Sequence, residues 1–170
     1  MRAITLTQPW ATLVAIGAKK IESRSWSTSY RGPLAIHAAK GWTKEVVRLA
    51  FVEPFKTVLD NAGYKLFSSL PRGAVVATCE LVFVREITAR QYTLDKTLGW
   101  KWTGPDGTYS FELDDQERAF GDYGPSRYAW MLHNIQALAE PIPAKGSLGL
   151  WEWNPQEPIQ VGSLAQERKA

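Results

Sequence analysis

The chain has 170 residues, 45% of them hydrophobic and 22% charged, which is typical of one globular domain with its own core. A formal net charge of +3 and a pI near 9.0 favour an anionic partner without requiring one. The start of the chain lacks the pattern of a signal peptide, and no apolar run is long enough to span a bilayer. A lone Cys79 excludes an internal disulfide, so we predict a cytoplasmic protein. We take a monomer as the default oligomeric state.

The first forty residues predict short strands around one buried helix. Alternating side chains predict a strand over Arg2–Leu6. A helix over residues 10–16 is apolar nearly all round, and Gly17 ends it. Two further strands are predicted over residues 20–26 and 33–38.

The middle of the chain predicts helix and then the longest strand. Thr43 is placed to cap a helix that meets Pro54, where it kinks or restarts before ending at residues 61–63. Residues 73–84 form the longest β-type run, and residues 88–94 are ambiguous.

The last third predicts a long loop between strands. Residues 99–124 are rich in Gly and Asp and carry several aromatic side chains, which indicates an extended surface loop packed by its own aromatics. Strands are predicted over residues 128–135 and 148–153, and a loosely attached polar tail over residues 154–170. Several short strands with few helices predict a barrel-like α+β domain over residues 1–153.

Charged side chains concentrate between the first helix and the second strand. Lys20, Glu22 and Arg24 are spaced by two, so on a strand they leave the same face. Lys19 lies at the turn, from which it can reach over that face or point into solvent. Cations flanking a carboxylate bind anions, and the carboxylate orients them or acts as a base. The structural alternative is an exposed face with salt bridges that each stabilise little.

Gly17, Lys19, Glu22 and Arg24 match the pattern G-x-K-x-x-E-x-R, which resembles the defining motif of ASCH domains, relatives of the PUA superfamily. The N-terminal segment is also similar to the ASCH domain of eukaryotic transcription coactivators. Further blocks that look like this family are residues 8–11, 31–39, 120–123, 127–130, 143–146 and 149–151.

The resemblance implies an α+β fold, a PUA-like mixed β-barrel of about five to seven strands with flanking helices and a cleft. It also implies RNA or nucleic-acid binding. Some small bacterial members are ribonucleases, and a divergent member is an amidohydrolase that removes the acetyl group from N4-acetylcytidine. The catalytic groups of that enzyme correspond to Lys19, to the position of Glu22, where it has a threonine, and to Glu80 on a later strand. Because Glu22 replaces that threonine, this chain lacks the threonine hydroxyl, which argues against the same amidohydrolase chemistry.

We therefore expect a cleft that holds single-stranded RNA or a nucleotide, with Glu22 against a base or ribose edge. The candidate contacts are Lys19, Lys20, Glu22, Arg24, Trp26, Arg31, Arg127 and Lys145. A solvated turn explains Arg31 equally well, and core packing explains Trp26 equally well.

Two rival functions stay open on the sequence. One is a hydrolase that uses Lys19, Glu22 and Glu80, either a nucleoside amidohydrolase or a ribonuclease assisted by Mn²⁺ or Mg²⁺. The other is a protein-interaction module that accepts an acidic peptide. With two histidines and one cysteine, no His/Cys metal cluster is predicted, and no cofactor is certain.

Overall fold

The computed structural model describes residues 1–88, 99–104 and 107–155. Its main element is a six-stranded mixed sheet in the order β2-β7-β4-β3-β1-β8. The strands are β1 (Arg2–Leu6), β2 (Ile21–Arg24), β3 (Gly32–Ala38), β4 (Ala74–Ile87), β7 (Arg127–Pro143) and β8 (Leu150–Glu152). β1 and β3 are parallel, with Ile4 opposite Ile36, and the other described pairs of this sheet are antiparallel.

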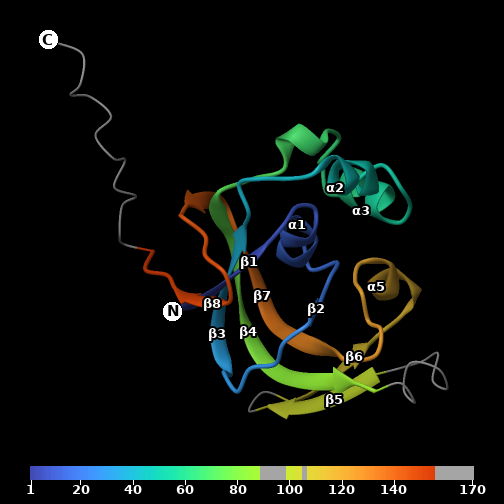
Figure 1. Ribbon diagram of the computed structural model, residues 1–170, viewed down its shortest axis with the longest axis vertical. Helices are drawn as coiled ribbons and strands as arrows, with labels where there is room; N and C mark the ends of the chain where they lie inside the picture. Colours follow the sequence, from blue (N-terminus) through green and yellow to red (C-terminus); the bar gives the residue numbers. More distant parts are fainter. Residues whose placement is uncertain (89–98, 105–106, 156–170) are drawn as a thin grey trace, which may run out of the picture.

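Short helices cover one side of this sheet, and a hairpin extends its far end (Figure 1). The helices are α1 (Trp10–Ala15), α2 (Lys44–Leu49), α3 (Phe55–Asn61), the 3₁₀ turn η1 (Phe67–Ser69) and α5 (Asp115–Ala119). The hairpin pairs β5 (Gly99–Gly104) with β6 (Gly107–Glu112).

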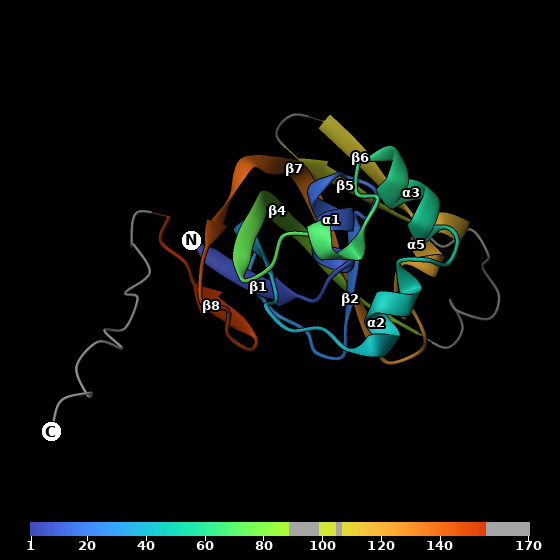
Figure 2. The ribbon, with the colours of Figure 1, turned by 90° about the horizontal axis from the view of Figure 1, so that it is seen from above.

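α1 is buried because it packs on both of its sides (Figure 2). Ala11 and Val14 pack against the sheet, in a cluster that includes Trp130. Leu13 packs in the opposite cluster, with aromatic side chains such as Phe55 from α3. A helix that is apolar nearly all round satisfies both layers, as its sequence predicts.

The sheet curves strongly around α1 (Figure 1). The register between β4 and β7 shifts at three places, and Asn134 in β7 has a positive φ of 48°. Such bulges bend a strand and increase its twist, which lets these two long strands wrap around a helix. The predicted α+β fold with about five to seven strands is confirmed, and among the described pairings its six strands form a curved sheet that ends at β2 and β8.

The expected surface loop over residues 99–124 is wrong, because this segment holds β5, β6 and α5. Glycines at residues 104 and 107 face each other at the end of the β5–β6 ladder, where the chain turns back. The α5 helix follows because the Asp114 carboxylate accepts a hydrogen bond from the Glu117 N–H at 2.7 Å and so caps the helix.

Several predicted boundaries also change. β2 is shorter than predicted, and β4 and β7 are longer, with β7 continuing to Pro143. The helical segment after Thr43 is two helices, α2 and α3, and Pro54 begins the second. Thr43 caps α2 as expected, accepting from the Val46 N–H at 3.4 Å. Residues 89–98, which include most of the ambiguous segment, and residues 156–170 of the predicted tail lie outside the described residues.

Candidate functional site

The turn after α1 buries the Lys19 side chain instead of exposing it. Gly17 ends the helix with a φ of +74°, a conformation that favours glycine, and the Lys19 N–H returns to the Leu13 carbonyl at 3.0 Å. The Lys19 side chain is then 0% exposed. Of the two positions expected from the sequence, the one in solvent is therefore wrong.

The buried Lys19 ammonium uses all three of its donors within the protein. Nζ donates to the Ile21 carbonyl at 2.5 Å, to the Tyr123 hydroxyl at 2.7 Å and to Glu117 Oε1 at 3.2 Å. Glu22 Oε2 lies further away, at 3.8 Å. A buried charge requires such compensation, and here the carboxylate that contacts it most closely comes from α5.

Glu117 connects α5 to the motif through both of its oxygens. Oε2 accepts the Lys20 backbone N–H at 2.9 Å, and Oε1 accepts the Tyr123 hydroxyl at 2.7 Å. The Tyr123 hydroxyl also lies within hydrogen-bond reach of the Ile21 carbonyl. Burial, together with the Glu117 charge, raises the pKa of Tyr123 well above its usual value, so the phenol is neutral and can donate its proton.

Glu22 and Arg24 form the accessible side of the motif. Glu22 Oε1 lies 3.3 Å from Arg24 Nε, and Arg24 Nη2 donates to the Thr5 carbonyl at 2.8 Å. Although Arg24 Nε is close to the carboxylate, its N–H is not directed at it and makes no hydrogen bond among the described residues. The guanidinium is therefore fixed at the end of β1 with hydrogen-bonding capacity left.

Arg24 lies where two surface pockets meet. The motif pocket, of about 470 Å³, is lined by residues that include Trp10, Glu22, Arg24, Phe120 and Arg127. The basic pocket, of about 770 Å³, is lined by residues that include Arg24, His37, Lys40, Arg72, Lys145 and Gly146. The two share Thr5, Thr7 and Arg24, so they adjoin at the ends of β1 and β2, and we call them together the cleft.

The other predicted binding residues divide between this cleft and the remaining surface. Lys145 lies in the basic pocket. Arg127 lies in the motif pocket but pairs with Asp122, with Nη2–Oδ2 and Nε–Oδ2 distances of 2.5 and 2.8 Å. Arg31 donates to the carbonyls of Thr28 and Tyr30, and it lines neither pocket.

Three more predicted residues lie away from the cleft. The Lys20 side chain is exposed, and its backbone N–H contacts Glu117. Trp26 packs edge-on against Trp130, with ring centroids 4.7 Å apart. Glu80 lies on β4 opposite Pro33 and His133, and among the described residues it forms no ion pair with Lys19.

Sequence reasoning missed Glu117, Tyr123, Lys40 and Arg72. Glu117 and Tyr123 fall in the segment that was expected to be loop, although residues 120–123 resemble the family. Lys40 and Arg72 follow β3 and precede β4, and only the sheet brings them together. A rule that charged residues next to strand ends share one sheet edge would have found them.

Metal ligands do not gather in the part of the chain that the structure describes: no three His, Cys, Asp or Glu side chains there are close enough to hold an ion. Among the described helices, none has the length and apolar composition needed to cross a membrane.

Comparison with known protein families shows the family of this chain. The ASCH domain family matches residues 4–139, so this chain belongs to the ASCH domain family. It is 22% identical over 149 residues to Activating signal cointegrator 1 from Mus musculus, which covers 88% of this chain but only 22% of that protein.

Solved structures show the same similarity. The crystal structure of ASCH from Zymomonas mobilis is 13% identical and has a TM-score of 0.49, with 90% of this chain and 87% of that chain covered. A mutant form of that protein is 12% identical, with a TM-score of 0.46 and coverages of 90% and 89%.

Proposed function

We propose that this ASCH domain binds single-stranded RNA or a nucleotide in the cleft formed by the motif pocket and the basic pocket. One observation carries the proposal. Lys40, Arg72 and Lys145 line the basic pocket with Arg24, and no acidic side chain among the described residues lines it. A concave surface with one sign of charge concentrates anionic ligands.

The motif pocket supplies groups of the kind that recognise a nucleoside. Trp10, which is half-buried, contributes an aromatic wall, and the Glu22 carboxylate can accept hydrogen bonds from base or ribose donors. Single-stranded RNA exposes unstacked bases and 2′-hydroxyls to such a cleft, whereas a duplex does not. Among the candidate contacts predicted from the sequence, Arg24 and Lys145 have the strongest support, because both line the basic pocket.

Binding is favoured over hydrolysis because Lys19 is committed to the interior. Its three donors serve Ile21, Tyr123 and Glu117, so it would have to lose buried hydrogen bonds to act on a ligand. The chain's own groups therefore support a binding cleft first and a hydrolase second.

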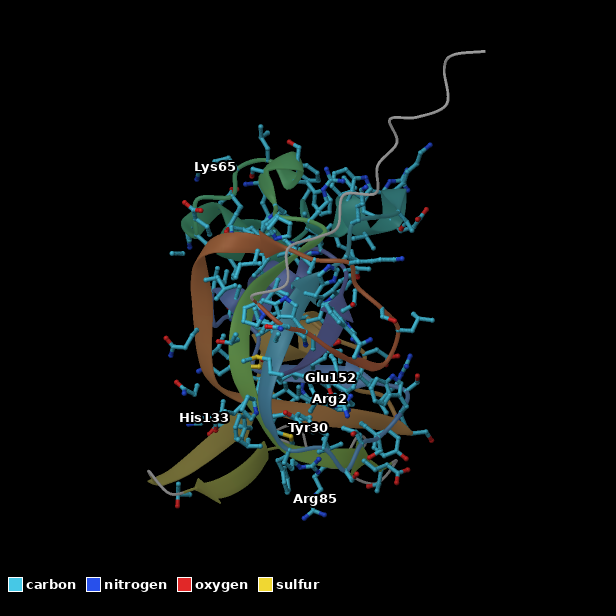
Figure 3. All side chains as sticks on the ribbon, turned by 90° about the vertical axis from the view of Figure 1, so that its left-hand side faces the viewer. Arg2, Tyr30, Lys65, Arg85, His133 and Glu152 are labelled. Carbon is cyan, nitrogen blue, oxygen red and sulfur yellow. The ribbon has the colours of Figure 1, made fainter. Side chains whose placement is uncertain are left out.

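A gel assay with labelled single-stranded RNA tests the proposal. Wild-type protein is expected to shift the RNA, and Arg24→Ala is expected to weaken the shift by about tenfold, because a charge-assisted contact is lost. Arg85→Ala is the matched control, since Arg85 is exposed, lines neither pocket and lies at the lower end of the sheet (Figure 3).

The same gel separates the rival functions. RNA cleavage with Mn²⁺ or Mg²⁺ that EDTA abolishes would establish the ribonuclease instead. Affinity for an acidic peptide with no RNA shift at low salt would contradict the proposal and favour a protein-interaction module.

A further inference from the structure

The basic pocket lies at one edge of the sheet, where parallel strands end together. β1 and β3 run parallel, so Thr7 after β1 and Lys40 after β3 emerge at the same edge. Arg72 precedes β4, and Lys145 precedes β8, so four separate segments supply the pocket wall. Its volume of about 770 Å³ is within the range of small-ligand sites.

Three cations in this pocket, Lys40, Arg72 and Lys145, have no acidic partner among the described residues. No carboxylate of the described residues lies within ion-pairing distance of Lys40, Arg72 or Lys145. Elsewhere on the surface, neighbouring charges pair, as Arg127 does with Asp122. Clustered like charges repel one another, so their positions are explained best by an anion that binds between them.

Arg72 is held in place by groups that leave its charge uncompensated. Its guanidinium carbon lies 3.4 Å from the ring centroid of Trp42, and its Nη1 donates to the Lys40 carbonyl at 3.4 Å. Stacking on an indole fixes the guanidinium plane without neutralising it. The remaining N–H donors are thereby oriented before a ligand arrives, which lowers the entropic cost of binding.

The floor of the pocket contains a buried histidine with one unused nitrogen. His37 is 2% exposed, and its Nε2 lies 3.1 Å from the Ala144 carbonyl, which requires a proton on Nε2. Nδ1 has no hydrogen-bond partner among the described residues. Gly146 covers this ring so closely that a Cβ there would lie 2.4 Å from His37 Cε1. Because Nε2 carries the proton, Nδ1 is a hydrogen-bond acceptor, so it could take a hydrogen bond from a hydroxyl group of a ligand but not from a fully ionised phosphate.

We propose that the basic pocket is a subsite for a terminal phosphate monoester, carried by a nucleotide or by the end of an RNA strand. The inference rests on the proposed function, because Arg24 joins this pocket to the motif pocket, where the attached nucleoside would lie. A monoester carries about two negative charges at neutral pH and three terminal oxygens, whereas an internal phosphodiester carries one charge. Three unpaired cations on separate segments match the monoester better.

Binding of paired RNAs tests the phosphate preference. A short single-stranded RNA would be compared with a 5′-phosphate, with a 3′-phosphate and with hydroxyls at both ends. One phosphorylated form is expected to bind about tenfold more tightly than the hydroxyl form. Comparing the binding of uridine 5′-monophosphate with that of uridine shows whether a free nucleotide, and not only the end of an RNA strand, can supply the phosphate.

Arg72→Ala is expected to abolish the preference for the phosphorylated form. Arg85→Ala is a close control, because Arg85 is also exposed and also stacks on an aromatic ring, with its guanidinium carbon 4.7 Å from the Phe83 centroid. Lys65→Ala is the matching control for Lys40→Ala and Lys145→Ala, since Lys65 is an exposed lysine outside the basic pocket.

Trp151 provides a direct report on the pocket. Its indole Nε1 donates to Thr5 Oγ1 at 3.2 Å, and its ring lies edge-on to His37 at 5.6 Å. Titration with inorganic phosphate is expected to shift the Trp151 indole signal in a ¹⁵N NMR spectrum, with Trp151→Phe providing the assignment. Arg72→Ala should suppress this shift.

The outcomes separate this inference from the proposed function. Equal binding of phosphorylated and hydroxyl RNA would overturn the terminal-phosphate site while RNA binding stands. A nucleotide and phosphate response without any RNA shift would support the phosphate site and contradict the RNA proposal. The inference would be overturned if the protein did not discriminate between phosphorylated and hydroxyl forms and the Trp151 signal did not respond to phosphate.

Discussion

At the scale of single residues, Lys19 shows how a motif lysine becomes part of the interior. Lys19 lies in the turn before β2, and its ammonium donates to Glu117 and Tyr123, which lie about a hundred positions later in the chain. Pairing a buried charge with a carboxylate offsets part of the hydration free energy that the charge loses on burial. The motif therefore fixes α5 and the residues around Tyr123 against β2. The motif side chains that line a pocket are Glu22 and Arg24.

Replacing Lys19 with methionine should destabilise the fold. Lys19→Met keeps most of the side-chain volume but leaves Glu22 and Glu117 without their shared cation, so we expect a loss of about 3–5 kcal/mol. Urea unfolding measures it. Lys20→Met is the control and should change the free energy of unfolding by less than about 0.5 kcal/mol, because that side chain is exposed. Similar losses for both variants would contradict the structural role of Lys19.

Cys79 should be inert in the native protein. Burial raises the pKa of its thiol to about 12, and its Sγ donates to the Leu34 carbonyl at 3.5 Å. The reactive thiolate is therefore almost absent at pH 8. We expect no reaction with a thiol-specific reagent at pH 8 until guanidinium unfolds the chain. Fast labelling of the folded protein would show that the β3–β4 pairing opens in solution.

At the scale of elements, the short α5 helix depends on its cap. Asp114 accepts the Glu117 N–H, and the same Glu117 side chain holds Lys19 and the Lys20 backbone. A five-residue helix has little stability of its own, so the cap and the buried glutamate determine whether it forms.

Asp114→Ala should therefore cost about 1 kcal/mol or more of stability, the usual loss for an N-cap. Asp115→Ala is the matched control, since Asp115 is also exposed and acidic but lies inside the first turn. Urea unfolding of both variants makes the comparison. An Asp115→Ala loss equal to that of Asp114→Ala would assign the effect to general charge instead of capping.

Sequence reasoning predicted most elements and failed where two signals conflicted. The strand over Arg2–Leu6, the buried helix after Pro9 and the Thr43 cap each follow from local patterns and are confirmed. The β5–β6 hairpin was missed because its glycines and aspartates indicate loop. Its aromatic residues alternate on both sides of Gly104-Pro105-Asp106-Gly107, which is a hairpin pattern that deserved more weight.

At the scale of the whole molecule, long-range pairing determines what the sequence cannot show. The site depends on residues from β1, β3 and β4 meeting at one edge, and on α5 reaching back to β2 (Figure 1). No local pattern predicts such contacts, because they are set by strand order. The family resemblance located Lys19, Glu22 and Arg24, but not Lys40 and Arg72 across the sheet. Cytoplasmic location, the monomeric state and the loosely attached tail stay predictions.

The salt dependence of RNA binding tests the cleft as one electrostatic unit. Each phosphate neutralised on a single strand contributes a log–log slope of about −0.7, because counterions are released. If Lys40, Arg72 and Lys145 share one terminal phosphate of about two charges and Arg24 contacts a second phosphate, the slope is roughly −2, whereas separate phosphates for all four would give roughly −3. Fluorescence anisotropy over a range of salt concentrations measures the slope.

Lys40→Ala should reduce the steepness of this slope by about 0.7 if Lys40 neutralises a phosphate of its own. Lys65→Ala should leave the slope unchanged, because Lys65 is an exposed lysine at the helical end of the molecule and lines a different pocket (Figure 3). Equal reductions in both variants would mean that RNA responds only to the net positive charge of the surface. A reduction confined to Lys40→Ala would place the strand in the cleft. Salt largely screens the interaction between charges that are more than about 10 Å apart, so a lysine far from the bound strand contributes little.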